Sequence, residues 1–148
     1  MQLSDKWFDA IAENEDGSFT YISGRSDIDA FIQSGKMKER IEITWNYEKD
    51  ERGVPCNDKE AQIMEAVQDR LQKAMERDKL AILTGIYTGN GKREWIFIAR
   101  NTQAFGERLN EALAGLPALP IEIYAEKDPD NEEYKDMLEL QGDDEEEE

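Results

Sequence analysis

Few side chains in this sequence combine a reactive group with a segment that could hold it in place. Glu42 and Glu94 lie in two segments of alternating polarity, and Arg93 directly precedes Glu94. Two carboxylates on neighbouring strands can act as general acid and general base when one of them is desolvated. Glu42, Glu94 and Arg93 therefore predict one candidate function, a small hydrolase or transferase that uses its carboxylates for catalysis.

Two scarce residue types argue against most other chemistry. The chain has no histidine, and Cys56 is its single cysteine. Without histidine it lacks the usual general base and the commonest ligand of transition metals. One cysteine can form neither an internal disulfide nor a zinc cluster of thiolates. The sequence thus favours a protein that is not an enzyme, and it predicts no cofactor and no metal site.

The tripeptide Arg93-Glu94-Trp95 has two interpretations. Alternate side chains of a strand point to opposite faces, so Arg93 and Trp95 share one face and Glu94 lies on the other. On an exposed strand, Arg93 or Glu94 would contact a ligand, with Trp95 beside them. If Trp95 belongs to the core, as aromatic residues in strands usually do, its neighbours form ordinary ion pairs, for example Glu94 with Arg40.

The remaining candidate ligand contacts are aromatic. Trp45 and Tyr47, together with Trp95 and Phe97, invite comparison with the rings that stack on bases in RNA-binding sheets. That comparison requires the rings to lie on an exposed face with basic residues near them. Trp45 alternates in phase with Ile43, which indicates a buried face instead.

The charge of the chain bears on its partners. There are 35 Asp and Glu against 18 Lys and Arg, giving −17, and the last six residues are all acidic, which leaves −11 for the rest. Such a surface repels nucleic-acid phosphates unless it carries a local basic patch. We therefore expect no nucleic-acid partner. The charge either attracts a basic protein or serves only solubility, and the second interpretation is the simpler one.

The order of strands and helices is the clearest structural signal. Residues 40–125 follow the pattern strand, helix, strand, strand, helix, strand, with helices expected at 58–77 and 102–114. This pattern is typical of the ferredoxin-like βαββαβ fold, an α+β fold in which two helices cover one face of an antiparallel sheet of four strands. The fold alone does not indicate a function, because it carries enzymes and binding modules alike.

Further elements flank this core. An N-terminal β-hairpin is expected over 7–23, turning at Asp16-Gly17, and a short helix over 130–140. The closing run of six acidic residues cannot bury apolar surface and repels itself, so 143–148 is expected to be a disordered tail. The chain is thus expected to form a single α+β domain over 1–142.

Local signals set the positions of the core elements. Residues 40–47 alternate strictly, which predicts a strand with one buried face. Thr102 is expected to cap the second helix, and Gly89-Asn90-Gly91 to form the tight turn of a hairpin. The first helix carries an apolar stripe at helical spacing, made of Ile63, Met64, Val67, Leu71, Ala74 and Met75.

Nothing in the sequence indicates a membrane protein. No segment approaches the roughly 18 apolar residues of a membrane span. Residues 1–11 lack the basic region and apolar run of a secretory signal. We expect a cytoplasmic protein without membrane contact, whose oligomeric state the sequence leaves open.

One stretch resembles a known family. Residues 80–98 read LAILTGIYTGNGKREWIFI, with a Gly-rich turn followed by an Arg-Glu-Trp strand. Trp45 and Tyr47 stand before Gly53-Val54-Pro55, and Asp128-Pro129 opens an acidic stretch that contains further aromatic residues. Over about residues 7–138 the chain is similar to the family called domain of unknown function 695. The resemblance implies a bacterial-type soluble α/β domain, and it supplies no catalytic residues because the family has no assigned activity.

The resemblance also bears on function by association. Some members of that family are joined to a domain similar to a protein inhibitor of ribonuclease E, a regulator with an acidic tail. Together with the acidic charge, this favours a non-enzymatic interaction or regulatory domain that binds a basic partner. The hydrolase or transferase that would use Glu42, Glu94 and Arg93 stays the alternative. An enzyme should place these side chains around a concave pocket, whereas a binding module should present an open face.

Overall fold

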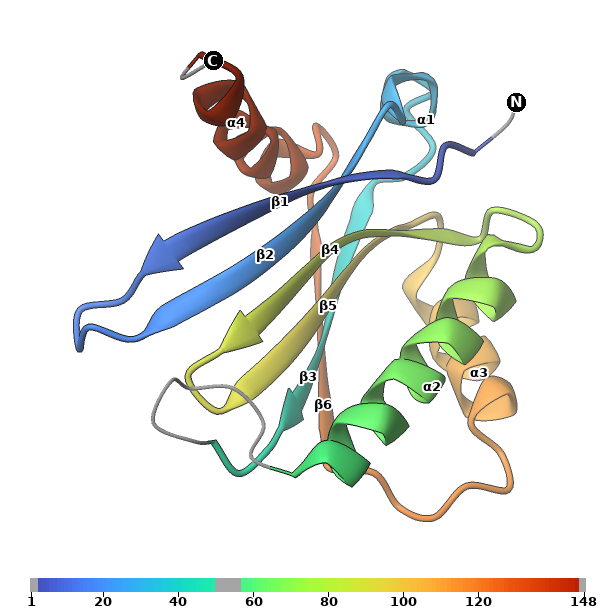
Figure 1. Cartoon of the computed structure of the whole chain (residues 1–148). Coiled ribbons are helices and arrows are strands. Elements are labelled where there is room, and N and C mark those ends of the chain that lie inside the picture. Colours follow the sequence, from blue (N-terminus) through green and yellow to red (C-terminus); the bar gives the residue numbers. More distant parts are fainter. Residues whose placement is uncertain (1–2, 50–56, 147–148) are drawn as a thin grey trace.

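The computed structural model describes residues 3–49 and 57–146, with side chains described as far as residue 140. Within these residues, six strands form one antiparallel sheet in the order β1-β2-β4-β5-β3-β6, accompanied by four helices (Figure 1). Gly53-Val54-Pro55 and Cys56 lie outside the described residues. The elements are β1 Lys6–Glu13, β2 Phe19–Ser26, α1 Asp29–Gln33, β3 Glu39–Asn46, α2 Asp58–Glu76, β4 Ala81–Gly89, β5 Lys92–Ala99, α3 Thr102–Ala112, β6 Ile121–Lys127 and α4 Glu132–Glu146.

The predicted N-terminal hairpin is present and enlarges the sheet. Its turn places Gly17 at φ +88°, and the Asp16 carboxylate accepts a hydrogen bond from the Ser18 amide at 2.9 Å. Strand β2 then pairs with β4, Tyr21 opposite Thr88. The sheet therefore has six strands where the predicted ferredoxin-like sheet has four. The α+β class and the antiparallel pairing are as predicted.

The first core lies between the sheet and the helices α2 and α3, which lie side by side on one face (Figure 1). Strand β3 contributes Ile41, Ile43 and Trp45, none more than 2% exposed, as its alternation predicts. The stripe of α2 faces them, except that Ile63, predicted to belong to it, is 45% exposed. Ile63 directly precedes Met64 and lies at the edge of the apolar stripe, on a side of the helix that faces away from the sheet.

The hairpin of β4 and β5 turns at Gly89-Asn90-Gly91, as predicted. Asn90 and Gly91 adopt φ values of +56° and +85°, which glycine and asparagine tolerate best. Strand β4 is buried along most of its length and contains a register shift between Leu83 and Gly85. Such a bulge lets a strand bend and re-aims its side chains. Here it lies where the hairpin β1–β2 joins the sheet.

Two predicted helix ends are displaced. Asn101, not Thr102, caps α3, because its side chain accepts a hydrogen bond from the Ala104 amide at 2.8 Å. The Thr102 hydroxyl instead donates to Glu39. Helix α4 was expected over 130–140 and runs from Glu132 to Glu146, so the backbone of 143–146 is helical where a disordered tail was expected. Glutamate is a good helix former, and adding residues to an existing helix costs little free energy.

A second core lies on the other face of the sheet, under α1 and α4. It contains Ile22, Ile28, Phe31, Met37, Ile82, Ile98, Tyr134 and Met137. Helix α4 approaches the sheet closely at Gly24 and Gly85, where a Cβ atom would meet side-chain atoms of Met137 at 3.1 and 2.9 Å. None of the helices in the described part is long and apolar enough to cross a membrane.

Candidate functional site

The structure distributes the predicted catalytic residues over both faces of the sheet. Strand register places Arg93 opposite Trp45, and places Glu94 opposite Thr44. Arg93 thus lies on the face covered by α2 and α3, whereas Glu94 lies on the other face together with Glu42. The three side chains therefore do not converge, and a site that needs Arg93 beside both carboxylates is not formed.

The predicted aromatic ligand contacts lie in the first core. Trp95, Trp45 and Tyr47 are 0%, 2% and 8% exposed. The two tryptophan rings meet edge to face, with centroids 6.2 Å apart, and their indole N–H groups donate to Gln68 and Glu60 of α2. These contacts satisfy the polar atoms of both rings. The rings consequently stabilise the fold and present no stacking surface.

Arg93 occupies the same side of the sheet, beside this core. Its Nε donates to the hydroxyl of Thr88 at 3.0 Å. Burial lowers the pKa of Arg93 below its usual value, and the charge of Glu65 opposes that effect. The contact ties β5 to β4 and explains the position of Arg93 without a ligand.

Glu42 and Glu94 lie on a part of the sheet that α1 and α4 leave uncovered. We call it the open face, formed by Arg40, Glu42, Thr44, Glu94, Glu122, Tyr124 and Glu126 of strands β3, β5 and β6. Cross-strand pairing places Tyr124 opposite Glu42 and Glu126 opposite Arg40. Four carboxylates thus share one face of three neighbouring strands.

The ion pairs of the open face differ from the pair expected from sequence. Arg40 was expected to pair with Glu94, but its Nη2 lies 2.9 Å from Glu42 and its Nη1 3.4 Å from Glu126. Glu94 pairs with Lys92 at 3.5 Å instead. Burial acts to lower the pKa of Arg40, but the hydrogen bond and charge of Glu42 outweigh it and raise that pKa. The Arg40 Nε is buried and has no partner among the described residues.

The open face carries more negative than positive charge and includes a large aromatic residue. Tyr124 is 56% exposed, and its hydroxyl donates to Glu126 at 3.2 Å, which raises the pKa of Tyr124. In the described part of the chain, no group of three or more metal-ligating side chains is close enough to hold a metal ion.

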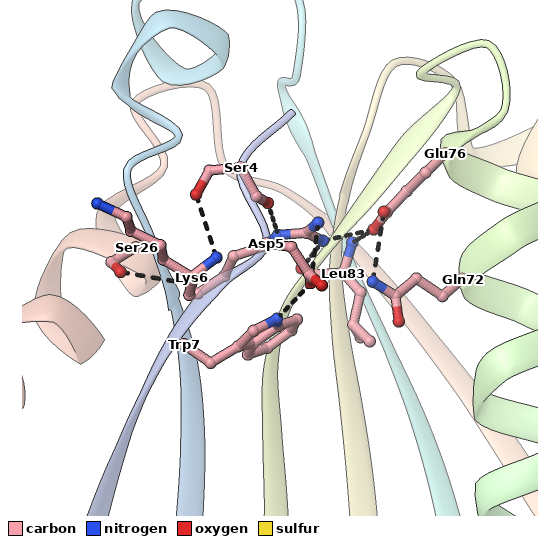
Figure 2. Close-up of polar contacts among 9 residues, drawn as sticks. Ser4, Asp5, Lys6, Trp7, Ser26, Gln72, Glu76 and Leu83 are labelled. Atoms are coloured by element: carbon pink, nitrogen blue, oxygen red, sulfur yellow. Dashed lines mark hydrogen bonds and ion pairs between the residues drawn. The ribbon is translucent and has the colours of Figure 1, made fainter. Parts of the chain in front are cut away.

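Sequence reasoning missed a buried polar cluster on the opposite face of the sheet. Arg25 of β2 is 2% exposed, and its Nη1 lies 2.6 Å from Oε2 of Glu76 at the end of α2. Its Nε donates to the carbonyl of Ser4 at 2.8 Å, and its guanidinium lies over the ring of Trp7, 5.1 Å from the centroid. Figure 2 shows Glu76 reaching from α2 toward Leu83 of β4, with Ser4, Asp5 and Trp7 around the same point.

The Arg25 cluster joins four segments of the chain. Glu76 also accepts hydrogen bonds from the Leu83 amide at 3.0 Å and from Gln72 at 3.3 Å. Every charge is thus matched by a partner, as buried ions require. No local pattern identifies Arg25, because its partner Glu76 lies 51 residues away. Only the strand register that places Trp7 opposite Arg25 could have indicated that Arg25 is buried.

Concave sites lie elsewhere on the surface. Four hollows, each about 230 to 350 Å³, are lined by described residues of loops, helices and the hairpin. Glu42, Glu94 and Arg93 line none of these four. Glu42 and Glu94 thus lie on the open face and Arg93 beside the first core, and none of them lines these hollows.

Comparison with known proteins places the chain in a family. No curated protein matches it, and no solved structure matches it. A family model matches residues 5–139, a span that runs from β1 to α4 and includes both cores. This protein belongs to the family of unknown function DUF695.

Proposed function

We propose that this protein is a non-enzymatic cytoplasmic interaction domain with a regulatory role, which binds a basic protein through the open face. The observation that carries the proposal is the exposed Tyr124 on the outer strand β6, which lies among the carboxylates of Glu42, Glu94, Glu122 and Glu126. Exposed tyrosines are frequent anchors of protein interfaces. Carboxylates around such an anchor attract a basic partner and orient it.

The edge of the sheet adds a second mode of contact. Strand β6 is the last strand of the described sheet, so one side of its backbone faces no neighbouring strand. An extended peptide can add to such an edge through main-chain hydrogen bonds while its side chains contact the adjoining face. A lysine- or arginine-rich segment laid along β6 would place its charges over Glu122 and Glu126.

The arrangement of charges supports binding over catalysis. Glu42 and Glu94 each pair with a neighbouring cation, Arg40 and Lys92, at 2.9 and 3.5 Å. Their side chains are 23% and 24% exposed, so water reaches both. A carboxylate that serves as general acid at neutral pH needs desolvation or a close like charge. The hydrolase or transferase alternative lacks this support.

We also infer that residues from β3 to β6 form a ferredoxin-like unit to which the hairpin β1–β2 is added. The inference is supported by the strand order β4-β5-β3-β6 and by the connections through α2 and α3 on one face. In this arrangement the open face is the side of the sheet opposite those two helices. Binding there leaves the first core undisturbed.

A defined basic probe tests the proposed function. Backbone NMR shifts of the full chain would be followed during titration with a lysine-rich peptide of about ten residues, at low and then raised salt. We expect shifts at β3, β5 and β6 that weaken as salt rises. The variant with Glu42→Gln, Glu94→Gln, Glu122→Gln and Tyr124→Ala should bind at least about tenfold more weakly.

A matched variant separates site binding from net charge. Asp69→Asn, Glu107→Gln and Glu111→Gln remove the same number of carboxylates from exposed positions of α2 and α3. This control should lose no more than about twofold in affinity. Equal losses in the two variants, or shifts spread over the whole surface, would show that the peptide senses only total charge and would refute the proposal.

A further inference from the structure

One end of the sheet collects cations although the chain is strongly acidic. The connection between α1 and β3 carries Lys36 and Lys38, the turn after α2 carries Lys79, the turn before α3 carries Arg100, and β6 ends at Lys127. All of these segments lie at the upper end of the sheet in Figure 1. The five side chains line two adjoining hollows of about 250 and 240 Å³, which share Lys36 and Arg100. We call this region the basic hollow.

The charges of the basic hollow are not neutralised within the described chain. None of its five cations lies within 4.0 Å of a described carboxylate oxygen, whereas Lys6, Arg25, Arg40, Lys73, Lys92 and Arg108 all do. Among the described residues that line the region, Glu39 is the one with a carboxylate, and it accepts a hydrogen bond from Thr102. The hollow thus retains a surplus of positive charge.

The first of the two hollows is also partly apolar. Phe31 and Met37, which are 6% and 3% exposed, line it together with Ser34. Both residues belong to the second core, so the apolar wall is held by packing beneath it. An apolar wall beside a cationic rim is the arrangement that binds a ligand with an anionic group and an apolar part.

Hydrogen bonds between the loops hold the rim in place. The Arg100 amide donates to the Leu80 carbonyl at 3.0 Å, and the Asp128 amide donates to the Lys38 carbonyl at 2.8 Å. The side chain of Asn131, itself buried, donates to the Met37 carbonyl at 2.7 Å. The site is therefore formed before any ligand arrives, which reduces the entropy lost on binding.

Lys79 of the rim has a backbone conformation that is unfavourable for lysine. Lys79 adopts φ +56°, a conformation that costs free energy in every residue with a Cβ atom and that favours glycine. A turn at the end of α2 would be more stable with glycine at this position. Lysine instead adds its charge beside Lys36 and Arg100.

We infer that the basic hollow binds a small organic anion, a phosphate or a carboxylate, whose apolar part rests on Phe31 and Met37. The inference is independent of the function proposed for the open face. A long polyanion fits less well, because it would extend from the hollow over a protein of net charge −17. A compact ligand places its charge against the rim alone, where lysine and arginine donors surround it.

Calorimetry and NMR titration of the full chain with four probes test this inference. Phenyl phosphate and benzoate combine an anionic group with a ring, inorganic phosphate lacks the ring, and benzyl alcohol lacks the charge. At least one of the first two should bind about tenfold more tightly than both of the others and shift the amides of residues 34–38, 79 and 100. The comparison of phenyl phosphate with benzoate identifies the anionic group.

Three variants show whether binding uses the rim. Lys36→Gln with Arg100→Gln should weaken binding about tenfold, and the control Lys59→Gln with Lys135→Gln, exposed lysines of α2 and α4, should change it less than about twofold. Lys79→Gly should weaken binding while raising the melting temperature, so loss of fold cannot explain its effect. Equal binding of benzyl alcohol, equal losses in both double variants, or tighter binding of a short RNA at the same residues would overturn the inference.

Discussion

Nη1 of Arg25 lies 2.6 Å from Oε2 of Glu76, and the two side chains are only 3% and 12% exposed. The pair connects the N-terminal hairpin to the end of α2 at the bulge of β4. Glu76 also accepts a hydrogen bond from the Leu83 amide, so the contact links β2, β4 and α2. The pairing of Arg25 with Glu76 therefore adds a side-chain link between β2 and α2 to the main-chain pairing of β2 with β4.

Breaking this pair should destabilise the protein strongly. Glu76→Ala leaves the buried Arg25 charge with only the exposed Asp5 carboxylate, 4.0 Å away, and we expect a loss of about 3–5 kcal/mol in the free energy of unfolding, measured by urea denaturation. The double variant Arg25→Met with Glu76→Leu should lose less than Glu76→Ala alone, because no buried charge remains. Asp69→Ala, which breaks the exposed pair with Lys73, should cost no more than about 1 kcal/mol. If Glu76→Ala and Asp69→Ala lower the free energy of unfolding equally, the Arg25–Glu76 pair does not have the proposed stabilising role.

Tyr134 attaches α4 to β2, the strand that carries Arg25. Its hydroxyl donates to the Arg25 carbonyl at 2.7 Å, and the residue is 4% exposed. Tyr134→Phe should cost about 1–3 kcal/mol, because the buried carbonyl loses its partner. Burial, together with the charges of Asp29 and Asp27, raises the pKa of Tyr134 above its usual 10.0.

The raised pKa of Tyr134 predicts a dependence on alkaline pH. For an acid whose pKa rises on folding, the stabilisation is fully present below the pKa of the unfolded chain, near 10.0, and is lost as pH increases above it. Wild-type stability should therefore fall more steeply above pH 10 than that of Tyr134→Phe. Parallel denaturation profiles of the two proteins would argue against this prediction.

An acid-sensitive contact joins the turn after α2 to α3. Arg108 donates to both carboxylate oxygens of Asp78, at 2.5 and 3.0 Å, and this hydrogen bonding lowers the pKa of Asp78 from 3.8 to about 2. The stabilisation is present above pH 3.8 and is lost as pH falls toward about 2. Because the Asp78 side chain is 54% exposed, its contribution should stay under about 1 kcal/mol.

NMR titration of the Asp78 carboxyl carbon measures this pKa directly. In the Arg108→Gln variant it should return toward 3.8, and the acid branch of the stability curve should become slightly flatter. A value near 3.8 in the wild-type protein would exclude the paired geometry in solution.

The packing of α4 on β4 should be sensitive to one methyl group. A Cβ atom at Gly85 would lie 2.9 Å from the Met137 sulfur, so Gly85→Ala should cost about 1–3 kcal/mol. Combining it with Met137→Ala should cost clearly less than the two single changes together, because the clash is relieved. Gly106→Ala is the control: it meets nothing within 4 Å in α3 and should stabilise by about 0.5–1 kcal/mol. Additive costs at Gly85 and Met137 would refute the close approach.

The sequence by itself determined most of the strands, helices and turns, because their signals depend only on residues close together in the chain. The alternation in β3 and the helical spacing in α2 record which side of each element is buried, since both periods follow from backbone geometry. The turn at Asn90-Gly91 needs two residues that accept positive φ, and the sequence provides them. The family was also recognisable from this stretch, because Gly89 to Trp95 combines the turn with the following strand.

Only the tertiary structure decided how these elements share space. Alternation separates Arg93 from Glu94 but cannot say which of the two faces lies under α2 and α3. The pair Arg25–Glu76 and the basic hollow of Lys36, Lys79 and Arg100 join segments far apart in the chain. No local energy term encodes such contacts, because they form only when the whole sheet is paired and every buried charge must find a partner. The sequence thus determined the elements and the family, whereas packing determined which charged residues are buried, paired or left open to a ligand.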